Sequence, residues 1–157
     1  MSQEHDPRMH TVEHVLNRTM IRMFGCDRSY STHLEPRKSH ADFRFSRPLD
    51  EAEFQAVERD VNEILAQNLP VTERLLRVDE AAALMDTSKL PPRIAADPAA
   101  LIRIVSVGDY DVCPCIGEHA AHTGEAGKIC LVSQGFTPAA EPGQPGRLRI
   151  RFKLAAS

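Results

Sequence analysis

Two pairs of potential metal ligands, each with a spacing of four residues, lie about a hundred residues apart in this chain. His10 and His14 form the first pair, and Cys115 and His119 form the second. Residues four apart lie one turn from each other on the same side of a helix, so two imidazoles can face one ion. Thiolate and imidazole are the ligands that zinc prefers, and two pairs supply the four donors of a tetrahedral site. The spacing predicts a zinc site, whereas exposed or hydrogen-bonded histidines would explain the first pair taken alone.

Helical periodicity predicts the two elements that would support these residues. Apolar residues recur at helical spacing before Gly25, which predicts a helix over 9–24 that carries both histidines of the first pair. Asp50, as an N-cap with Glu53 three residues later, predicts a second helix that Pro70 closes.

Strand patterns fill most of the remaining chain. Residues 29–45 predict two short strands around a turn at 35–37. Further strands are predicted at 71–78, 101–112, 128–134 and 147–154, with a short helix at 79–86 and a proline-marked loop at 89–100. Because strands follow one another without strict alternation with helices, the order predicts an α+β fold, a two-layer sandwich of helices packed on a mostly antiparallel sheet.

Length and composition limit the class of protein. A chain of 157 residues, 42% of them hydrophobic, fits one domain over 1–157. Four cysteines without a secretion signal favour free thiols or metal ligands, and no apolar stretch is long enough to span a bilayer, so we expect a cytoplasmic protein. The net charge of −3 means that a nucleic acid would have to meet a local basic patch. These numbers leave the oligomeric state open.

The motif set resembles the editing domain of alanyl-tRNA synthetase. The HxxxH pair comes early, the CxxxH pair comes late, and the latter is followed by HTGEAG at 122–127. The stand-alone relatives of that domain, the short-type AlaX proteins, are the more similar group. They share the Tyr30–Ser31–Thr32 stretch and an acidic residue, here Glu118, before the last histidine. The resemblance runs from about His10 to Leu154.

This resemblance implies a fold, an activity and a set of site residues. The fold would be the two-layer sandwich of the editing domain. The activity would be zinc-dependent hydrolysis, in trans, of the ester that links a wrong amino acid to tRNA specific for alanine. That amino acid is typically serine and sometimes glycine. The implied Zn²⁺ ligands are His10, His14, Cys115 and His119.

The resemblance also implies substrate contacts. The hydroxyl-bearing residue of the pocket falls on Ser29, with Ser31 and Thr32 as nearby alternatives. Two departures bear on fine specificity more than on the metal site. This chain has Ile116–Gly117–Glu118 where the synthetase has Gly-Gly-Thr, and Ala126 where a branched aliphatic residue is usual.

Several further residues have both a functional and a structural interpretation. Glu118 would activate water or be a surface acid, and His40 would lie near the pocket or form a structural hydrogen bond. Gly124 would help to cradle the end of the tRNA or form an ordinary turn. Asp109 and Asp111 would hydrogen bond to the ligand imidazoles or form a turn.

Two questions about function stay open at this level. Four protein ligands close a tetrahedral zinc site, which favours an ion that positions the substrate over one that activates water. The arginines and lysine at 147–153 would meet phosphates or form a solvated strand face. The alternative to an editing enzyme is a noncatalytic RNA- or synthetase-binding module with a structural zinc site. A further alternative is a globular domain whose histidines and cysteines are merely packed.

Overall fold

The computed structural model describes residues 6–85, 90, 92–115 and 117–155. Ile116 and parts of the predicted helix at 79–86 and loop at 89–100 therefore lie outside the described residues. Within the described ranges, no helix combines the length and the apolar character needed to cross a membrane.

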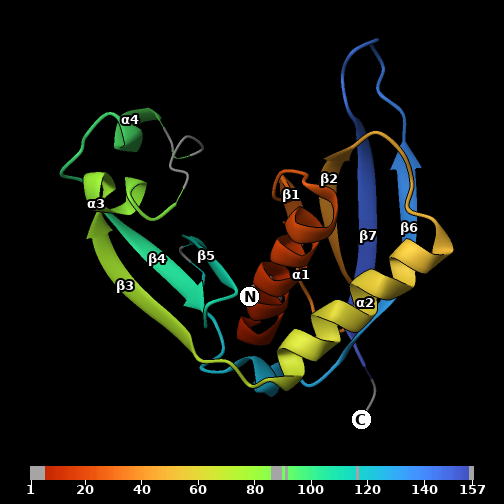
Figure 1. The fold of residues 1–157 in the computed structure, drawn as a ribbon, viewed down its shortest axis with the longest axis horizontal. Helices are drawn as coiled ribbons and strands as arrows, with labels where there is room; N and C mark the ends of the chain where they lie inside the picture. The colour runs from red at the N-terminus through yellow and green to blue at the C-terminus, as the bar shows by residue number, and fades with distance from the viewer. Residues whose placement is uncertain (1–5, 86–89, 91, 116, 156–157) are drawn as a thin grey trace.

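The chain folds into two antiparallel sheets and several helices, so the predicted α+β class is confirmed (Figure 1). One sheet has four strands in the order β1-β2-β7-β6, and the other has three in the order β3-β4-β5. The elements in chain order are α1 (Pro7–Phe24), β1 (Ser31–His33), β2 (Ser39–Phe45), α2 (Glu51–Ala66), β3 (Val71–Arg77), α3 (Val78–Ala82), α4 (Pro92–Ala95), β4 (Leu101–Val107), β5 (Asp111–Pro114), the 3-10 helix η2 (Thr123–Ala126), β6 (Ile129–Thr137) and β7 (Gly146–Leu154).

Helix α1 begins two residues before the predicted helix and ends at the predicted residue. The Asp6 carboxylate accepts a hydrogen bond from the Arg8 backbone, and Pro7 occupies the first turn, where its missing N–H is not needed. Gly25 ends the helix with a φ of 67°, a left-handed conformation that glycine adopts without strain. The apolar side of α1 is fully buried and comprises Met9, Val12, Val15, Leu16 and Met20.

Helix α2 has the predicted capping box but ends earlier than predicted. Asp50 accepts from the Glu53 backbone, and the Glu53 side chain accepts from the Asp50 backbone. The helix ends at Ala66 rather than near Pro70, because Asn68 adopts a left-handed φ of 53°. Asparagine tolerates this conformation better than most residues and so stops the helix before the proline does.

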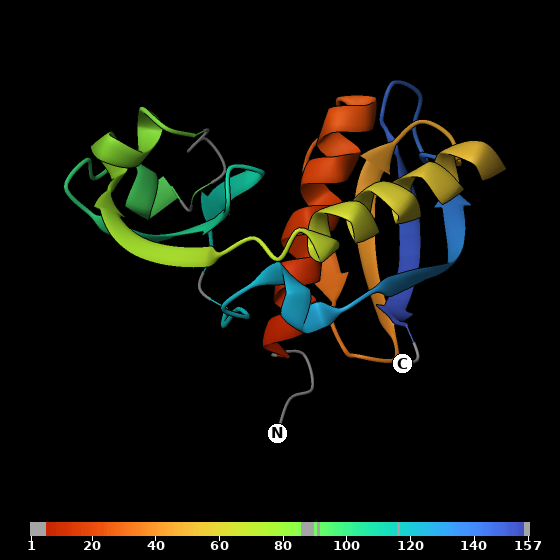
Figure 2. The same ribbon diagram turned by 60° about the horizontal axis from the view of Figure 1, so that its bottom comes forward.

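The two sheets have separate hydrophobic cores and form two lobes, where the sequence predicted one sheet. In the larger lobe, α1 and α2 cover one face of the four-stranded sheet, as Figure 2 shows. In the smaller lobe, a cluster made by Val78, Ala81, Ile102 and Ile104 lies between the three-stranded sheet and its helices.

The split arises at a turn that the sequence analysis missed. The stretch 101–112, predicted as one strand, reverses direction at Gly108, whose φ is 49°, and becomes β4 and β5 paired to each other. A Cβ atom at Gly108 would lie 3.2 Å from the Leu69 side chain, so both the space and the backbone angle favour glycine.

The predicted hairpin at 29–45 and the last strand form as predicted, and they define two different faces. Leu148, Ile150 and Phe152 of β7 are buried in the larger core. The alternating residues Arg147 and Arg151 are exposed on the other face.

Candidate metal centre

Helix α1 and the segment after β5 bring three of the four predicted ligands together, with His14 beside them. Side-chain ligand atoms of His10, Cys115 and His119 lie within 4.8 Å of one another. The His14 ring is centred 4.8 Å from the His119 ring. Residues about a hundred positions apart thus form one compact cluster of three imidazoles and one sulfur. We call it the ligand cluster.

Asp111 fixes the orientation of His14. Its Oδ2 atom lies 2.9 Å from His14 Nδ1, and both side chains are buried, with 3% of the histidine and none of the aspartate exposed. A histidine whose Nδ1–H donates to a carboxylate presents the lone pair of Nε2 to a metal ion. The hydrogen bond to a ligand imidazole, one of the two interpretations of Asp111, is therefore present, whereas Asp109 is exposed.

The other carboxylate oxygen of Asp111 binds two arginines. Oδ1 accepts from Arg18 Nε at 3.0 Å and from the Arg28 guanidinium. Burial alone would raise the pKa of Asp111, but the bond from His14 and the charge of Arg28 outweigh it and hold the pKa well below its usual range. Burial would likewise lower the pKa of His14, and the hydrogen bond to Asp111 reverses that effect, so the pKa is raised.

His14, Asp111 and Cys113 make a second group of potential ligands. Cys113 Sγ lies 3.3 Å from His14 Nδ1, the same nitrogen that Asp111 binds. Because the Asp111 carboxylate is already paired with two guanidinium groups, its charge is less available to a cation. The ligand cluster is the better metal site of the two.

Buried nitrogen atoms without a hydrogen-bond partner show that the cluster fits a cation. His14 Nε2 and both ring nitrogens of His119 are buried and unpartnered among the described residues. An unsatisfied buried polar atom costs about 1–3 kcal/mol, so several together in one place require an explanation. A metal ion bound by these nitrogens would provide it, and the donor set is compatible with such a site.

The sulfur of the cluster is poised as a thiolate. Burial opposes ionisation of Cys115, but the neighbouring imidazoles of His10, His119 and His14 outweigh it and lower the pKa of the thiol to about 3. Thiolate is the form that binds a metal, so Cys115 needs no further activation as a ligand near neutral pH.

Gly117 allows the segment after β5 to pack against His10. A Cβ atom at this position would lie 2.3 Å from His10 Cε1 and 2.4 Å from Nδ1. Arg103 Nη1 donates to the Gly117 carbonyl at 2.9 Å and so holds the segment against β4. Any side chain here would displace the imidazole.

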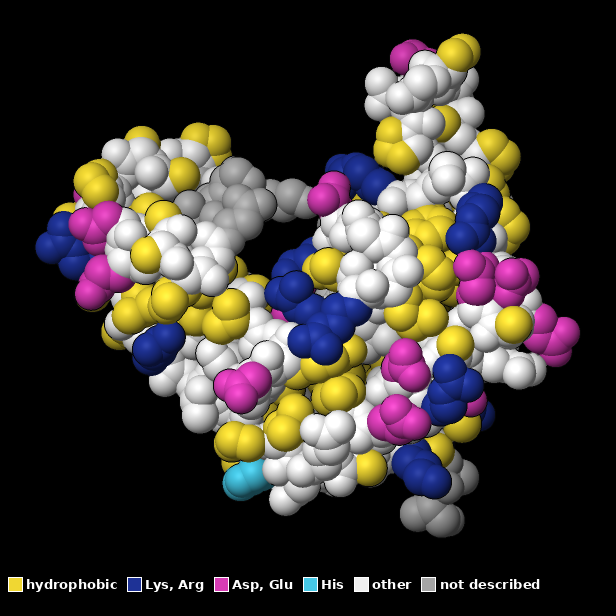
Figure 3. Space-filling model, in the orientation of Figure 1, with side chains coloured by type: hydrophobic (Ala, Val, Ile, Leu, Met, Phe, Trp, Pro, Cys, Tyr) yellow, Lys and Arg dark blue, Asp and Glu magenta, His cyan; other side chains and the backbone are white. Residues whose placement is uncertain are grey.

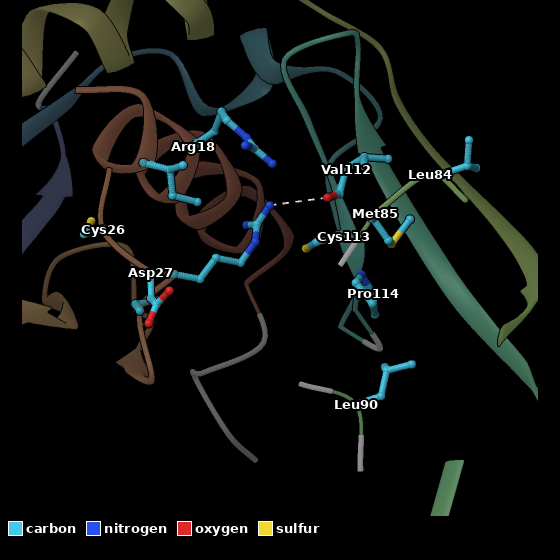
Figure 4. A pocket seen from close by; sticks show the side chains of 12 residues that line it. Arg18, Cys26, Asp27, Leu84, Met85, Leu90, Val112, Cys113 and Pro114 are labelled. Atoms are coloured by element: carbon cyan, nitrogen blue, oxygen red, sulfur yellow. Dashed lines mark hydrogen bonds between the residues drawn. The ribbon is translucent and has the colours of Figure 1, made fainter. Parts of the chain in front are cut away.

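A cavity of about 650 Å³ between the two lobes lies beside the cluster and is lined in part by Ser29 and Cys113 (Figure 4). Figure 3 shows the hollow between the lobes, with basic side chains on its α1 side. Asn17 Oδ1 accepts from the Ser29 backbone N–H at 2.6 Å, which fixes Ser29 against α1. Ser31 and Thr32 are not among the lining residues, because they belong to β1 and pair with β2.

Two other predicted residues, Glu118 and His40, are not part of the ligand cluster. Glu118 follows Gly117 in sequence and is exposed. His40 points to the face of β2 opposite the core residues Ala41 and Phe43, and its ring stacks on that of His33 at 5.9 Å, so the structure does not bring it to the cavity.

Gly124 also lies away from the cavity. A Cβ atom there would be 2.3 Å from Asn68 Oδ1, and the glycine thus permits η2 to pack against the end of α2. The neighbouring Thr123 is fully buried and donates to the Leu65 carbonyl at 3.0 Å. This geometry matches the interpretation as a structural turn.

The sequence analysis missed Glu13 and Asn17, two polar residues of α1. Burial raises the pKa of the Glu13 carboxyl, although the charges of His14 and His10 oppose this effect. Asn17 is 3% exposed and lies one helical turn after Glu13. Its side-chain amide donates a hydrogen bond to the Glu13 backbone carbonyl. Their positions three or four residues from the histidines were the available signal, but polar residues on a helix are usually solvated.

Comparisons with known proteins show which sequences this chain is similar to. Residues 102–150 match the family model described as the threonyl and alanyl tRNA synthetase second additional domain. The chain is 28% identical over 131 residues to an alanine–tRNA ligase of Caldicellulosiruptor saccharolyticus, covering 83% of this chain and 14% of the ligase. It is 26% identical over 146 residues to that of Treponema denticola (92% and 23%) and 29% identical over 128 residues to that of Acetivibrio thermocellus (81% and 14%).

The fold and the cluster define an α+β domain with a candidate metal centre between two lobes. The comparisons confirm the resemblance that the motifs indicated. This chain is similar to alanyl-tRNA synthetases over most of its length, and part of it matches the second additional domain of threonyl and alanyl tRNA synthetases. It spans less than a quarter of the length of these relatives.

Proposed function

We propose that this protein hydrolyses mischarged aminoacyl-tRNA in trans, with serine on tRNA specific for alanine as the preferred substrate. The observation that carries the proposal is the ligand cluster, with its unpartnered buried nitrogens, beside the inter-lobe cavity. The similarity to alanyl-tRNA synthetases supports tRNA as the substrate class. The protein would act in the cytoplasm, where aminoacyl-tRNA is used.

The proposed metal is zinc, held by His10, His14, Cys115 and His119. When bound, zinc supplies a Lewis acid or a template that orients the substrate. Asp111 binds His14 Nδ1 and so leaves Nε2 available to a metal ion, and the thiolate of Cys115 would offset part of the charge of that ion.

The chain's own residues would position the ester. Ser29, fixed by Asn17, places a hydroxyl at the cavity wall, where it can hydrogen bond to the serine side chain of the substrate. Arg28, also on the wall, offers a guanidinium to the terminal phosphate or ribose. An ester needs less activation than an amide, so such positioning accounts for much of the required acceleration.

An acid near the cluster would accept the proton from the attacking water. Glu118 is the candidate predicted from the sequence. Glu13 of α1 is a second candidate, because burial raises the pKa of its carboxyl. Replacing each with glutamine separates them, because only loss of the proton acceptor lowers the rate of hydrolysis without weakening metal binding.

The test is release of serine from seryl-tRNA specific for alanine by the purified protein and by Cys115→Ala. Cys130→Ala, in β6 within the four-stranded sheet, is the matched control. We expect zinc-dependent release by the wild type and the control, and loss of both metal and activity in Cys115→Ala. Release at the spontaneous rate by zinc-loaded wild type would refute the hydrolase.

A noncatalytic RNA- or synthetase-binding module is the second candidate, and one observation favours it. His14 lies beside the three donors of His10, Cys115 and His119, and a fourth donor would complete the tetrahedral coordination of a structural zinc site. This candidate predicts one zinc per chain and a lower melting temperature on metal removal, with no release of serine.

A further inference from the structure

The outer face of the four-stranded sheet concentrates positive charge in a chain whose net charge is −3. Four exposed cations share this face, which we call the cationic face; they are Arg44 of β2 and Arg147, Arg151 and Lys153 of β7. Arg44 and Arg147 are direct partners across the two strands. Among the described residues, none of the four has a carboxylate within ion-pairing distance.

The acid on this face is already neutralised. Asp42 is 4% exposed, and both of its oxygens accept from Arg149, at 2.8 and 3.0 Å. The pair leaves the surrounding cations without a carboxylate partner in the described part of the chain. Alternate residues of a strand are about 6.6–6.8 Å apart, which is close to the separation of neighbouring phosphates along a nucleic-acid strand.

Surface depressions connect the cationic face with the inter-lobe cavity. Cys26 lines both the cavity and a second depression that also contains Arg44. Arg44 in turn lines a third depression with Tyr30 and Arg147. Neighbouring depressions that share a lining residue therefore extend from Arg28, beside the ligand cluster, to Arg147 of β7. The neighbouring Arg47 contributes little charge, since Glu53 binds it through two hydrogen bonds.

An exposed aromatic ring lines one of these depressions. Tyr30 is 45% exposed, and the Arg44 guanidinium lies 4.5 Å from the centre of its ring. A solvent-exposed ring beside a cation is the arrangement on which nucleic-acid bases stack, while the cation meets the phosphate.

We propose that the cationic face is the docking surface for an RNA strand whose 3′ end enters the inter-lobe cavity. Arg44, Arg147 and the remaining cations contact successive phosphates, and Tyr30 supports a base where the strand turns from the sheet toward the cavity. The occupant is the acceptor arm of a tRNA, and this choice rests on the proposed function. The proposal adds where the RNA lies, which the ligand cluster does not specify.

The test measures binding of deacylated alanine-specific tRNA at several salt concentrations. Each lost phosphate contact reduces the steepness of log K against log salt by about 0.7 and weakens binding about 5-fold at 0.1 M salt. We expect the double variant Arg44→Gln/Arg147→Gln to bind about 25-fold more weakly, with a salt slope shallower by about 1.4.

The control is Arg59→Gln/Arg93→Gln, which removes the same charge from α2 and α4. Its affinity and slope should match the wild type, because both arginines lie outside the cationic face. Equal weakening of the two double variants would mean that only net charge matters, and an unchanged slope in the first would overturn the docking surface. Binding of polyglutamate should be measured in the same way. If polyglutamate binds the wild type as tightly as tRNA does, and the variants weaken its binding equally, the cationic face would be assigned to an acidic protein instead.

A third variant and a second substrate complete the test. Tyr30→Leu should weaken tRNA binding severalfold with no change in slope, since it removes stacking but no charge, whereas Tyr30→Phe should restore binding. The Arg44/Arg147 variant should hydrolyse seryl adenosine, an ester without phosphates, at the wild-type rate. If no variant or wild type hydrolyses any ester, the hydrolase proposal fails while the binding data still decide the docking surface.

Discussion

Replacing Asp111 by asparagine should disable the metal centre without removing any of the proposed ligands. Each carboxylate oxygen of Asp111 accepts hydrogen bonds from different partners. Oδ2 accepts from His14, and Oδ1 accepts from Arg18 and Arg28. Asparagine has the same shape but only one acceptor, because its other terminal atom is an NH₂ donor. One of the two sides must therefore face a donor.

Either orientation of the new amide harms the site. With its NH₂ toward His14, the amide donates to Nδ1, so the proton moves to Nε2 and the nitrogen that faces the ion can no longer bind it. With its NH₂ toward Arg18 and Arg28, the amide N–H groups face the guanidinium N–H groups in a buried position, where neither can accept a hydrogen bond. The negative charge that orients His14 is also lost. Loss of such a carboxylate partner typically weakens metal binding about 10- to 100-fold, or about 1.4–2.8 kcal/mol. Because both partners here are buried, we expect the upper end of this range.

The assay is competition for zinc between the protein and a chromophoric chelator, together with urea denaturation of the metal-free protein. Asp109→Asn is the matched control, since Asp109 is exposed and lies two residues earlier in the same turn. The control should bind zinc as the wild type does. Wild-type affinity in Asp111→Asn would refute the inference that this carboxylate orients His14.

Three further perturbations test other parts of the structure. Gly117→Ala should force the His10 ring to move by at least about 1 Å, since 2.3 Å must become 3.4 Å, and should weaken zinc binding more than 10-fold in competition assays while metal-free stability stays near wild type. Chelation should lower the wild-type melting temperature, because an ion at 100 times its Kd adds about 2.7 kcal/mol, but should not change that of Cys115→Ala. Burial raises the pKa of Asp42, but the ion pair with Arg149 lowers it by more, so the net pKa is below its usual value. The ionised carboxylate therefore stabilises the fold above about pH 4, and this stabilisation is lost as the pH falls through the lowered pKa. Asp42→Asn should therefore lose less stability than the wild type between pH 5 and pH 3 in urea titrations, and identical slopes would contradict this.

The helices and the ligand spacing were predictable because they depend on local rules. Capping by Asp50 and the left-handed Gly25 act within one turn, and the four-residue spacing of His10 and His14 is a property of a single helix. These signals are complete within a short window of sequence. The predicted helices therefore differ from those in the structure only by small shifts of the helix ends.

The remaining features depend on contacts between distant segments. Nothing local shows that the strand over 101–112 reverses at Gly108, since a continuous apolar run fits one strand or two. The bond between His14 and Asp111 joins residues 97 positions apart. The face on which His40 lies was likewise fixed only when β2 paired with β7.

The division of the molecule into two cores has a consequence for how an ion would be held. His10 and His14 belong to the larger lobe, whereas Cys115 and His119 follow β5 of the smaller lobe, whose core is made of only a few side chains. A bound ion would therefore link the two lobes. Transient unfolding of the smaller lobe would release the ion while the larger lobe stays folded. The rate at which the metal exchanges would then report the opening of the small lobe and not the unfolding of the whole chain.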